Sequence, residues 1–165
     1  MVSIKINEDE ITAVLDRLAR HLTDMTPVMS EVGELLIDST KQRFIKGVSP
    51  EGQTWAPKSQ TTLDAYAARG DRVDFRPLFG PTKRLSSEIN YQTTESRVEW
   101  GSNLIQAAVM HFGAGKGEFG TGANGQALPW GNIPARPFIG ISDEDRGNIK
   151  ATVYEWLEQV SKAKD

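Results

Sequence analysis

The chain has 165 residues, of which 38% are hydrophobic and 25% are charged, and its formal net charge is −3. These values predict a single domain, 1–165, with its own core and no overall attraction to nucleic acid or to an acidic membrane. The sequence contains no cysteine, which excludes disulfides, thiolate nucleophiles and Cys-based metal sites and fits a reducing cytoplasm. No apolar run approaches the roughly 20 residues that span a bilayer, and the first residues lack the apolar region of a secretory signal.

The first third of the chain predicts a short strand and two helices. Apolar residues alternate over 2–6, which is typical of a strand, and then recur at helical spacing over about 8–23. A second helix is predicted over 27–46, with Thr26 as its N-cap and Gly47 as its C-terminal stop. Two adjacent amphipathic helices need a surface on which to bury their apolar faces.

The middle of the chain predicts strands. Polar and apolar residues alternate over 97–101, and the runs 86–93 and 96–101, joined around 94–96, favour a β-hairpin. The apolar run 104–112 is compatible with a further strand or a short helix, and 136–141 is compatible with a strand. A short helix is also indicated near 62–69.

A last helix is predicted over 143–161, with Ser142 as its N-cap. The acidic residues at 143–145 lie in its first turn, where the helix macrodipole alone accounts for them. Together, the elements predict an α+β fold with three amphipathic helices on one face of a mainly antiparallel sheet.

A glycine-rich segment interrupts these elements. Glycines occur at 113, 115, 117, 120, 122 and 125. Because glycine loses more backbone entropy on ordering than any other residue, this density predicts a long, mobile loop over 113–129. Long loops in compact domains are usually functional or disordered, and we expect this one to become ordered on contact with a partner.

The sequence offers little for catalysis. The segment 115–120 matches the pattern G-x-G-x-x-G, but the residues after it cannot begin the helix that a dinucleotide site requires. His111 lies in an apolar stretch, where a histidine is more often a packing residue than a ligand or a base. We therefore expect no enzyme activity, no catalytic residues, no cofactor and no metal site.

A basic and aromatic stretch over 69–84 leaves nucleic-acid binding open as an alternative function. Its cations are Arg69, Arg72, Arg76, Lys83 and Arg84, and Phe75 and Phe79 lie among them. Basic side chains neutralise phosphates and aromatic rings stack on bases, so this stretch is compatible with a nucleic-acid-binding module. Neighbouring aspartates dilute its charge, and we do not expect nucleic acid as a partner because a nucleic-acid footprint is strongly net basic.

Two motifs with proline, glycine and aromatic residues favour docking over chemistry. The first comprises Arg43-Phe44 and residues 50–57, and the second comprises residues 133–140. Proline fixes φ and glycine permits positive φ, so both motifs are interpreted as rigid devices that place the chain. Arg136, held between two prolines, is predicted to bind carbonyls or to pair with a carboxylate.

We expect partner contacts from the 113–129 loop and from the 47–57 elbow, because both are predicted to be exposed. Tryptophan and arginine are enriched at the hot spots of protein interfaces. The interface candidates are Trp55, Lys116, Phe119, Trp130, Arg136 and Phe138.

The same motifs carry a family resemblance. In chain order they are Arg43-Phe44, Pro50-x-Gly52, Trp55-x-Pro57, Thr61-Thr62-Leu63, Trp100-Gly101-Ser102, the run 107–113 and the block Ile133-Pro134-Ala135-Arg136-Pro137-Phe138-Ile139-Gly140. This order resembles the Mu-like phage virion morphogenesis, or tail completion, family, from the second helix to about residue 160. The segment 78–85 departs from it, because the family usually has a shorter Thr-Gly-x-Leu step there.

The resemblance implies a non-enzymatic structural protein of a phage or prophage. Such a protein completes the tail, or joins it to the head-neck connector, through contacts with other tail or neck proteins. The resemblance also implies a homo-oligomeric ring in the assembled particle. It places the protein in the host bacterial cytoplasm during assembly and in the virion afterwards, without a membrane partner.

Overall fold

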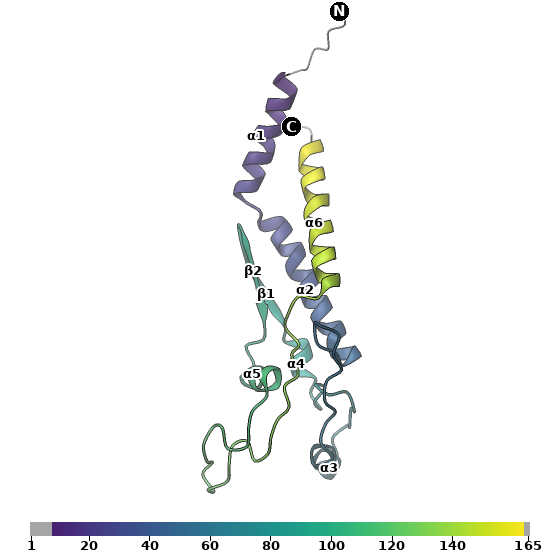
Figure 1. Cartoon of the computed structure of the whole chain (residues 1–165), viewed down its shortest axis with the longest axis vertical. Helices are drawn as coiled ribbons and strands as arrows, with labels where there is room; N and C mark the ends of the chain where they lie inside the picture. Colours follow the sequence, from purple (N-terminus) through teal and green to yellow (C-terminus); the bar gives the residue numbers. More distant parts are fainter. Residues whose placement is uncertain (1–7, 164–165) are drawn as a thin grey trace, which may run out of the picture.

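The computed structural model describes residues 8–163, which form six helices and one pair of strands (Figure 1). The helices are α1 (Glu8–Thr23), α2 (Thr26–Lys46), α3 (Gln60–Ala68), α4 (Arg84–Ser87), α5 (Ile105–Phe112) and α6 (Asp143–Lys162). The strands are β1 (Asn90–Thr94) and β2 (Arg97–Gly101). The molecule is elongated, with α1 at one end and α3 and a long irregular excursion at the other (Figure 1).

Helix α2 lies at the centre of the fold, where it contacts α6, both strands and α4. The prediction that Thr26 is its N-cap is wrong, because Met25 occupies that position and Thr26 is already helical. Instead, the Asp24 Oδ1 atom accepts a hydrogen bond from the Thr26 N–H at 2.9 Å. Gly47 ends the helix as predicted, with a φ of 71° and its N–H donating to the Arg43 carbonyl.

Two apolar clusters lie along α2. The cluster nearer α1 joins α2 to α6 and is formed by Val28, Trp156 and Val160. The other surrounds Phe44, which is fully buried and whose ring centroid lies 5.8 Å from that of Trp55 and 5.2 Å from that of Phe138. Burying a large apolar side chain contributes about 1.5–3 kcal/mol, so this aromatic cluster fixes where the two sequence motifs meet.

The sheet is smaller than the sequence predicts. The predicted hairpin is confirmed, but it is limited to β1 and β2, which pair antiparallel with Tyr91 opposite Trp100. Of the run 104–112, residues 105–112 form the helix α5, so the helical alternative holds and the strand does not. The strand predicted over 2–6 lies outside the described residues.

The predicted strand over 136–141 is also absent, because other groups occupy its backbone. The carbonyls of Phe138 and Gly140 accept hydrogen bonds from the Arg43 side chain at 3.2 and 2.8 Å. Pro137 has no N–H to offer a neighbouring strand. The segment therefore forms no strand in the described structure, and it bends at 139–140.

The helices predicted over 8–23, 27–46 and 143–161 correspond to α1, α2 and α6, and the helix indicated near 62–69 corresponds to α3. Ser142 is the N-cap of α6 as predicted, since its side chain accepts from the Asp145 N–H. Helix α4 was not part of the predicted fold, and α5 corresponds to the helical alternative for the apolar run 104–112. The fold is therefore mixed helix and sheet, with a two-stranded hairpin in place of a larger sheet that carries three helices.

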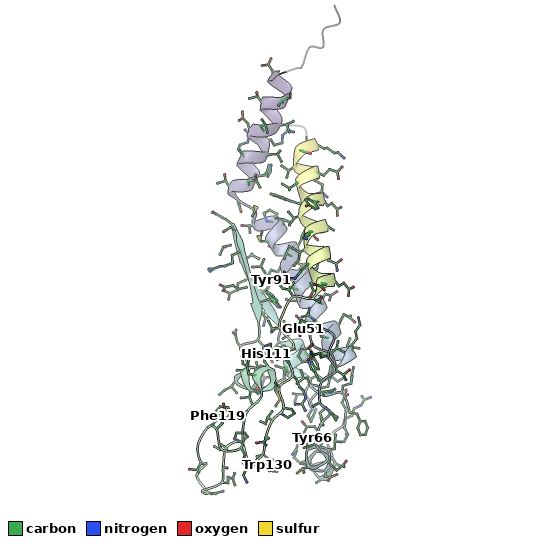
Figure 2. All side chains as sticks on the ribbon, viewed as in Figure 1. Glu51, Tyr66, Tyr91, His111, Phe119 and Trp130 are labelled. Atoms are coloured by element: carbon green, nitrogen blue, oxygen red, sulfur yellow. The ribbon has the colours of Figure 1, made fainter. Side chains whose placement is uncertain are left out.

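The hairpin packs closely on α2 at Gly33. A Cβ atom at this position would lie 2.4 Å from Cδ2 of the Tyr91 ring, well inside van der Waals contact. Tyr91 projects from β1 toward α2 (Figure 2). A glycine in mid-helix costs about 0.5–1 kcal/mol relative to alanine, and here it permits the close approach of the hairpin.

We predict that Gly33→Ala destabilises the protein by about 1–3 kcal/mol, because the added methyl group overpacks the contact with Tyr91. The matched control is Gly147→Ala in α6, where a Cβ atom would meet open space, so helix propensity should stabilise the fold by up to about 1 kcal/mol. Urea unfolding of both variants measures the difference. A Gly33→Ala protein as stable as wild type would contradict the close packing.

Candidate protein-interaction site

A buried arginine joins α2 to the second sequence motif and to the start of α6. The Arg43 Nη1 atom donates to the carbonyls of Phe138 and Gly140, and Nη2 donates to the Ser39 hydroxyl at 3.0 Å. Nη2 also forms an ion pair with the Asp145 carboxylate. Both charged side chains are nearly inaccessible, at 7% and 3%. Burying a charge is costly unless it is paired and hydrogen-bonded, and these contacts meet that condition.

Asp145 has a second role at the start of α6. Its carboxylate accepts from the Ser142 N–H at 2.8 Å, while its own N–H donates to the Ser142 hydroxyl, which is a reciprocal capping box. The sequence analysis attributed the acidic residues at 143–145 to the helix macrodipole alone. For Asp145 this interpretation is wrong, because its carboxylate also caps the helix and pairs with Arg43. Burial would raise the pKa of Asp145, but the Ser39 hydroxyl, the Ser142 donors and Arg43 outweigh it and hold the pKa below its usual value.

The two sequence motifs hold each other in place. The Arg136 Nε atom donates to the Ala56 carbonyl at 2.8 Å, and its Nη2 donates to the Pro57 carbonyl at 2.9 Å. The Trp55 indole N–H donates in return to the Pro137 carbonyl at 3.0 Å. The prediction that Arg136 binds carbonyls is confirmed. We call this meeting of residues 50–57 with 133–140 the motif junction.

His111 completes the junction as a packing residue, as predicted. Its Nδ1 atom accepts from the N–H of Phe138 at 3.3 Å, and its ring lies edge-on to those of Phe112 and Phe138. Burial lowers the pKa of His111, which favours the neutral ring that can accept this bond. His111 therefore links α5 to the second motif (Figure 2).

The structure divides the six interface candidates into two groups. Three are buried at the motif junction, where they fix the chain and offer no surface to a partner: Trp55, Arg136 and Phe138. The other three lie exposed on the excursion between α5 and the second motif: Lys116, Phe119 and Trp130. Within the 47–57 elbow, only 51–54 and 56–57 are exposed, so the predicted exposure of the elbow holds in part.

The excursion is a doubled-back arm, which we call the glycine arm and define as residues 113–133. Ala114 pairs with Ile133 at its root, and Thr121 pairs with Ala127 near its end. Gly113 has a φ of 78°, and a Cβ atom there would lie 2.7 Å from the Ile133 carbonyl oxygen, so the root requires glycine. The mobility predicted for this segment stays a prediction.

Large apolar side chains are exposed on the glycine arm and on α5. The arm presents Phe119 at 57% and Trp130 at 67%, and both lie at the end of the molecule far from α1 (Figure 2). Helix α5 presents Ile105 and Phe112. Exposed apolar patches are characteristic of interaction surfaces. Sequence analysis missed the two α5 residues, because exposure could not be assigned while strand and helix were both open.

The basic stretch 69–84 is largely neutralised within itself. Arg69 pairs with Asp71 at 2.9 Å, Arg76 with Asp74 at 2.5 Å, and Arg84 with Glu88 at 2.6 Å. The hydrogen bonds from Arg76 lower the pKa of Asp74 to about 2. Phe79 is buried and Phe75 is exposed, so only one of the two rings is open to a base. These contacts weaken the nucleic-acid interpretation.

Within residues 8–163, no helix is both long enough and apolar enough to cross a membrane. In the same range, no group of three or more His, Cys, Asp or Glu side chains is placed to hold a metal ion. What the described chain does present is a rigid junction and exposed apolar contact residues, as in proteins that act by binding other proteins.

The chain belongs to the phage virion morphogenesis family, whose model matches residues 6–158. It is also similar to a protein of Haemophilus influenzae named Mu-like prophage FluMu G protein 2. The two are 25% identical over 163 residues, which cover 98% of this chain and 100% of the relative. No solved structure matches the chain significantly. The family resemblance inferred from the motifs is confirmed, and with it a role in virion morphogenesis.

We predict that Arg43→Met destabilises the fold by about 3–5 kcal/mol, because it leaves the buried Asp145 carboxylate without its charge partner. As a matched control, Arg97→Met breaks an ion pair with Glu99 whose side chains are 68% and 64% exposed. Surface pairs of this kind contribute little, so the control should unfold like wild type. Equal stability of Arg43→Met and Arg97→Met in urea would contradict the account.

We also predict a specific acid sensitivity. The pKa of Asp145 is lower in the folded chain than its ordinary value of 3.8. Its stabilising effect is therefore complete above that value and is lost as the pH falls through the lower, folded-state pKa. Asp145→Asn should be less stable near neutral pH and should lose less stability on acidification. Unfolding free energies measured down through the carboxyl range test this, and parallel curves for the two proteins would refute it.

Proposed function

We propose that this protein is a structural component of a phage or prophage virion that completes the tail or joins it to the head-neck connector. The family match over 6–158 is the observation that carries this proposal. Its partners would be other tail or neck proteins, met in the host cytoplasm during assembly and retained in the virion. The role would be binding without catalysis.

The shape of the molecule supports a contact role for the glycine arm. The arm leaves the fold at the motif junction, where Arg136, Trp55 and His111 fix both of its ends by hydrogen bonds. Its aromatic side chains then lie at the far end of the molecule (Figure 2). Phe119 and Trp130 are the proposed main contact residues, since aromatic side chains are enriched at protein interfaces, and the exposed Lys116 lies on the same arm.

In the particle, the protein would form a homo-oligomeric ring. Ring contacts are head to tail, so each copy uses two different surfaces and the rotation between copies closes the assembly. An elongated subunit with a protruding arm suits this arrangement, because the arm can reach a neighbouring subunit or a tail protein (Figure 1).

We predict that deleting residues 115–125 spares folding and blocks virion assembly, because these residues belong to the arm and lie outside both apolar clusters. The test is complementation of a prophage that lacks the gene, with particles counted by electron microscopy and infectivity measured. Full-length protein should restore complete virions, and the deletion should yield heads and tails that remain separate.

A finer variant, Phe119→Ser with Trp130→Ser, should also fail to complement. Tyr154→Ser is its matched control, because Tyr154 is an aromatic of similar exposure, 69%, on α6. Normal infectivity of the arm deletion would contradict the role of the arm. Normal virions in the complete absence of the protein would contradict the proposed function itself.

A further inference from the structure

The hairpin of β1 and β2 leaves the outer edges of both strands open. In an antiparallel pair, alternate residues of each strand direct their N–H and C=O groups away from the partner strand. Within residues 8–163, no hydrogen bond outside the β1–β2 ladder reaches the backbone of either strand. Helix α2 packs on one face of the hairpin and leaves these edges free. An open edge is a template for a further strand.

The edge strand β2 has an apolar face and a charged face. Trp100 lies opposite Tyr91 and therefore faces α2, and Val98 faces the same way. Both Trp100 and Val98 are only half-buried, so α2 does not cover this face completely. Arg97 and Glu99 face the other way and are exposed. A strand that continues the sheet beyond β2 therefore needs one apolar face and one polar face.

The residues that precede α1 alternate in this way. Val2, Ile4 and Ile6 are apolar, and Ser3 and Lys5 between them are polar. A strand formed by these residues has one apolar face of β-branched side chains and one polar face with a single positive charge. The segment 2–6 thus has the pattern that the edge of β2 requires.

Charge selects the edge of β2 over that of β1, and with it a register. The exposed residues of β1, at 90, 92 and 94, are uncharged. On β2, Glu99 lies 3.4 Å from Arg97 of its own strand and stays 64% exposed, so it can accept a second cation. An antiparallel strand with Lys5 opposite Glu99 also sets Ile4 opposite Trp100. Opposite charges and aromatic with β-branched residues are both favourable cross-strand pairs.

The segment 2–6 cannot reach β2 of its own chain. The Met25 N–H donates to the Glu95 carbonyl at 3.0 Å, which places the turn of the hairpin at the end of α1 that joins α2. From there α1 extends away from the hairpin over 16 residues, or about 24 Å (Figure 1). Lys5 lies three residues before Glu8, so even an extended chain carries it only about 11 Å from the start of α1. A strand of these residues on β2 must come from another copy.

We propose that residues 2–6 of one copy add to the outer edge of β2 of a second copy as an antiparallel strand. Lys5 then lies opposite Glu99, and Ile4 and Ile6 extend the apolar face that α2 half covers. The contact is head to tail, because each copy donates one segment and accepts one, and it closes into a ring when the rotation between copies allows.

This inference rests on the homo-oligomer of the proposed function and names the contact between its copies. The tests use purified protein and not virions. A failure of the strand pairing therefore leaves the proposed role in the virion standing, and that role has its own test by complementation.

The first test is light scattering of the full chain over a concentration series. A five-residue strand buries less surface than the roughly 1,200 Å² of a stable complex, so the mass should rise reversibly above 18.2 kDa with concentration. Ile4→Ser with Ile6→Ser should keep the mass of one chain. The matched control, Ile4→Val with Ile6→Val, keeps the apolar face and should associate like wild type. A wild-type monomer at every concentration, or a serine variant that associates normally, would overturn the proposal.

The second test locates the added strand and uses the absence of native cysteine. In the proposed register Ser3 lies opposite Gly101, and a Cβ atom at Gly101 would meet open space. Opposite Cα atoms of paired strands are about 4.5–5.5 Å apart, within the roughly 7 Å that a disulfide allows. Ser3→Cys and Gly101→Cys, prepared as separate proteins and oxidised as a mixture, should therefore give a disulfide-linked heterodimer. Each protein oxidised alone should give little.

Asn90→Cys is the matched control for the edge, because Asn90 pairs with Gly101 from the far strand, β1. Neighbouring strands lie about 4.8 Å apart, so Ser3 beyond β2 would be about 9.6 Å from Asn90, too far for a disulfide. A link from Ser3→Cys to Asn90→Cys, or to Arg97→Cys as a parallel strand requires, would overturn the proposal. So would the absence of any link, the result expected if a strand of another protein takes this edge.

Discussion

The buried charge of Arg43 is the constraint on which the rest of the structure depends. A guanidinium that is removed from water must find acceptors, and this one finds them on three separate segments of the chain. It draws the second sequence motif against α2 and sets the start of α6 beside both. The aromatic cluster around Phe44 then fills the space next to it, and the motif junction follows from these two arrangements.

The proposed function rests on the segments that extend from this junction without packing into the core. Proline and glycine residues at the junction let the chain turn without regular pairing, so the glycine arm leaves a fixed point and carries its aromatic residues away from the core. At the other end of the molecule, α1 keeps an uncovered apolar stripe. With exposed apolar residues at both ends, a virion morphogenesis protein of this shape is suited to the proposed role of linking neighbours in an assembly (Figure 1). The two apolar clusters lie between these ends.

Local patterns in the sequence predicted the helices well, because periodicity and capping are properties of adjacent residues; Gly47 and Ser142 are the clearest cases. The sheet was overestimated, because the apolar residues of 136–141 are compatible with a strand but cannot reveal that Arg43 occupies two carbonyls of that segment. The Arg43–Asp145 pair spans 102 residues, and no local pattern marks a partner so far away. Of the six interface candidates, composition could not separate the three that are buried from the three that are exposed.

The most direct test of the central claim is photo-cross-linking from the arm inside assembling particles. A photoreactive amino acid replaces Trp130, and the same substitution at Tyr154, an aromatic of similar exposure on α6, serves as the reference. Mass spectrometry identifies the linked protein. The account predicts that the position in the arm links to a tail or neck protein, or to a neighbouring copy, in completed virions. Particles in which that position forms no cross-link to any virion protein would contradict it.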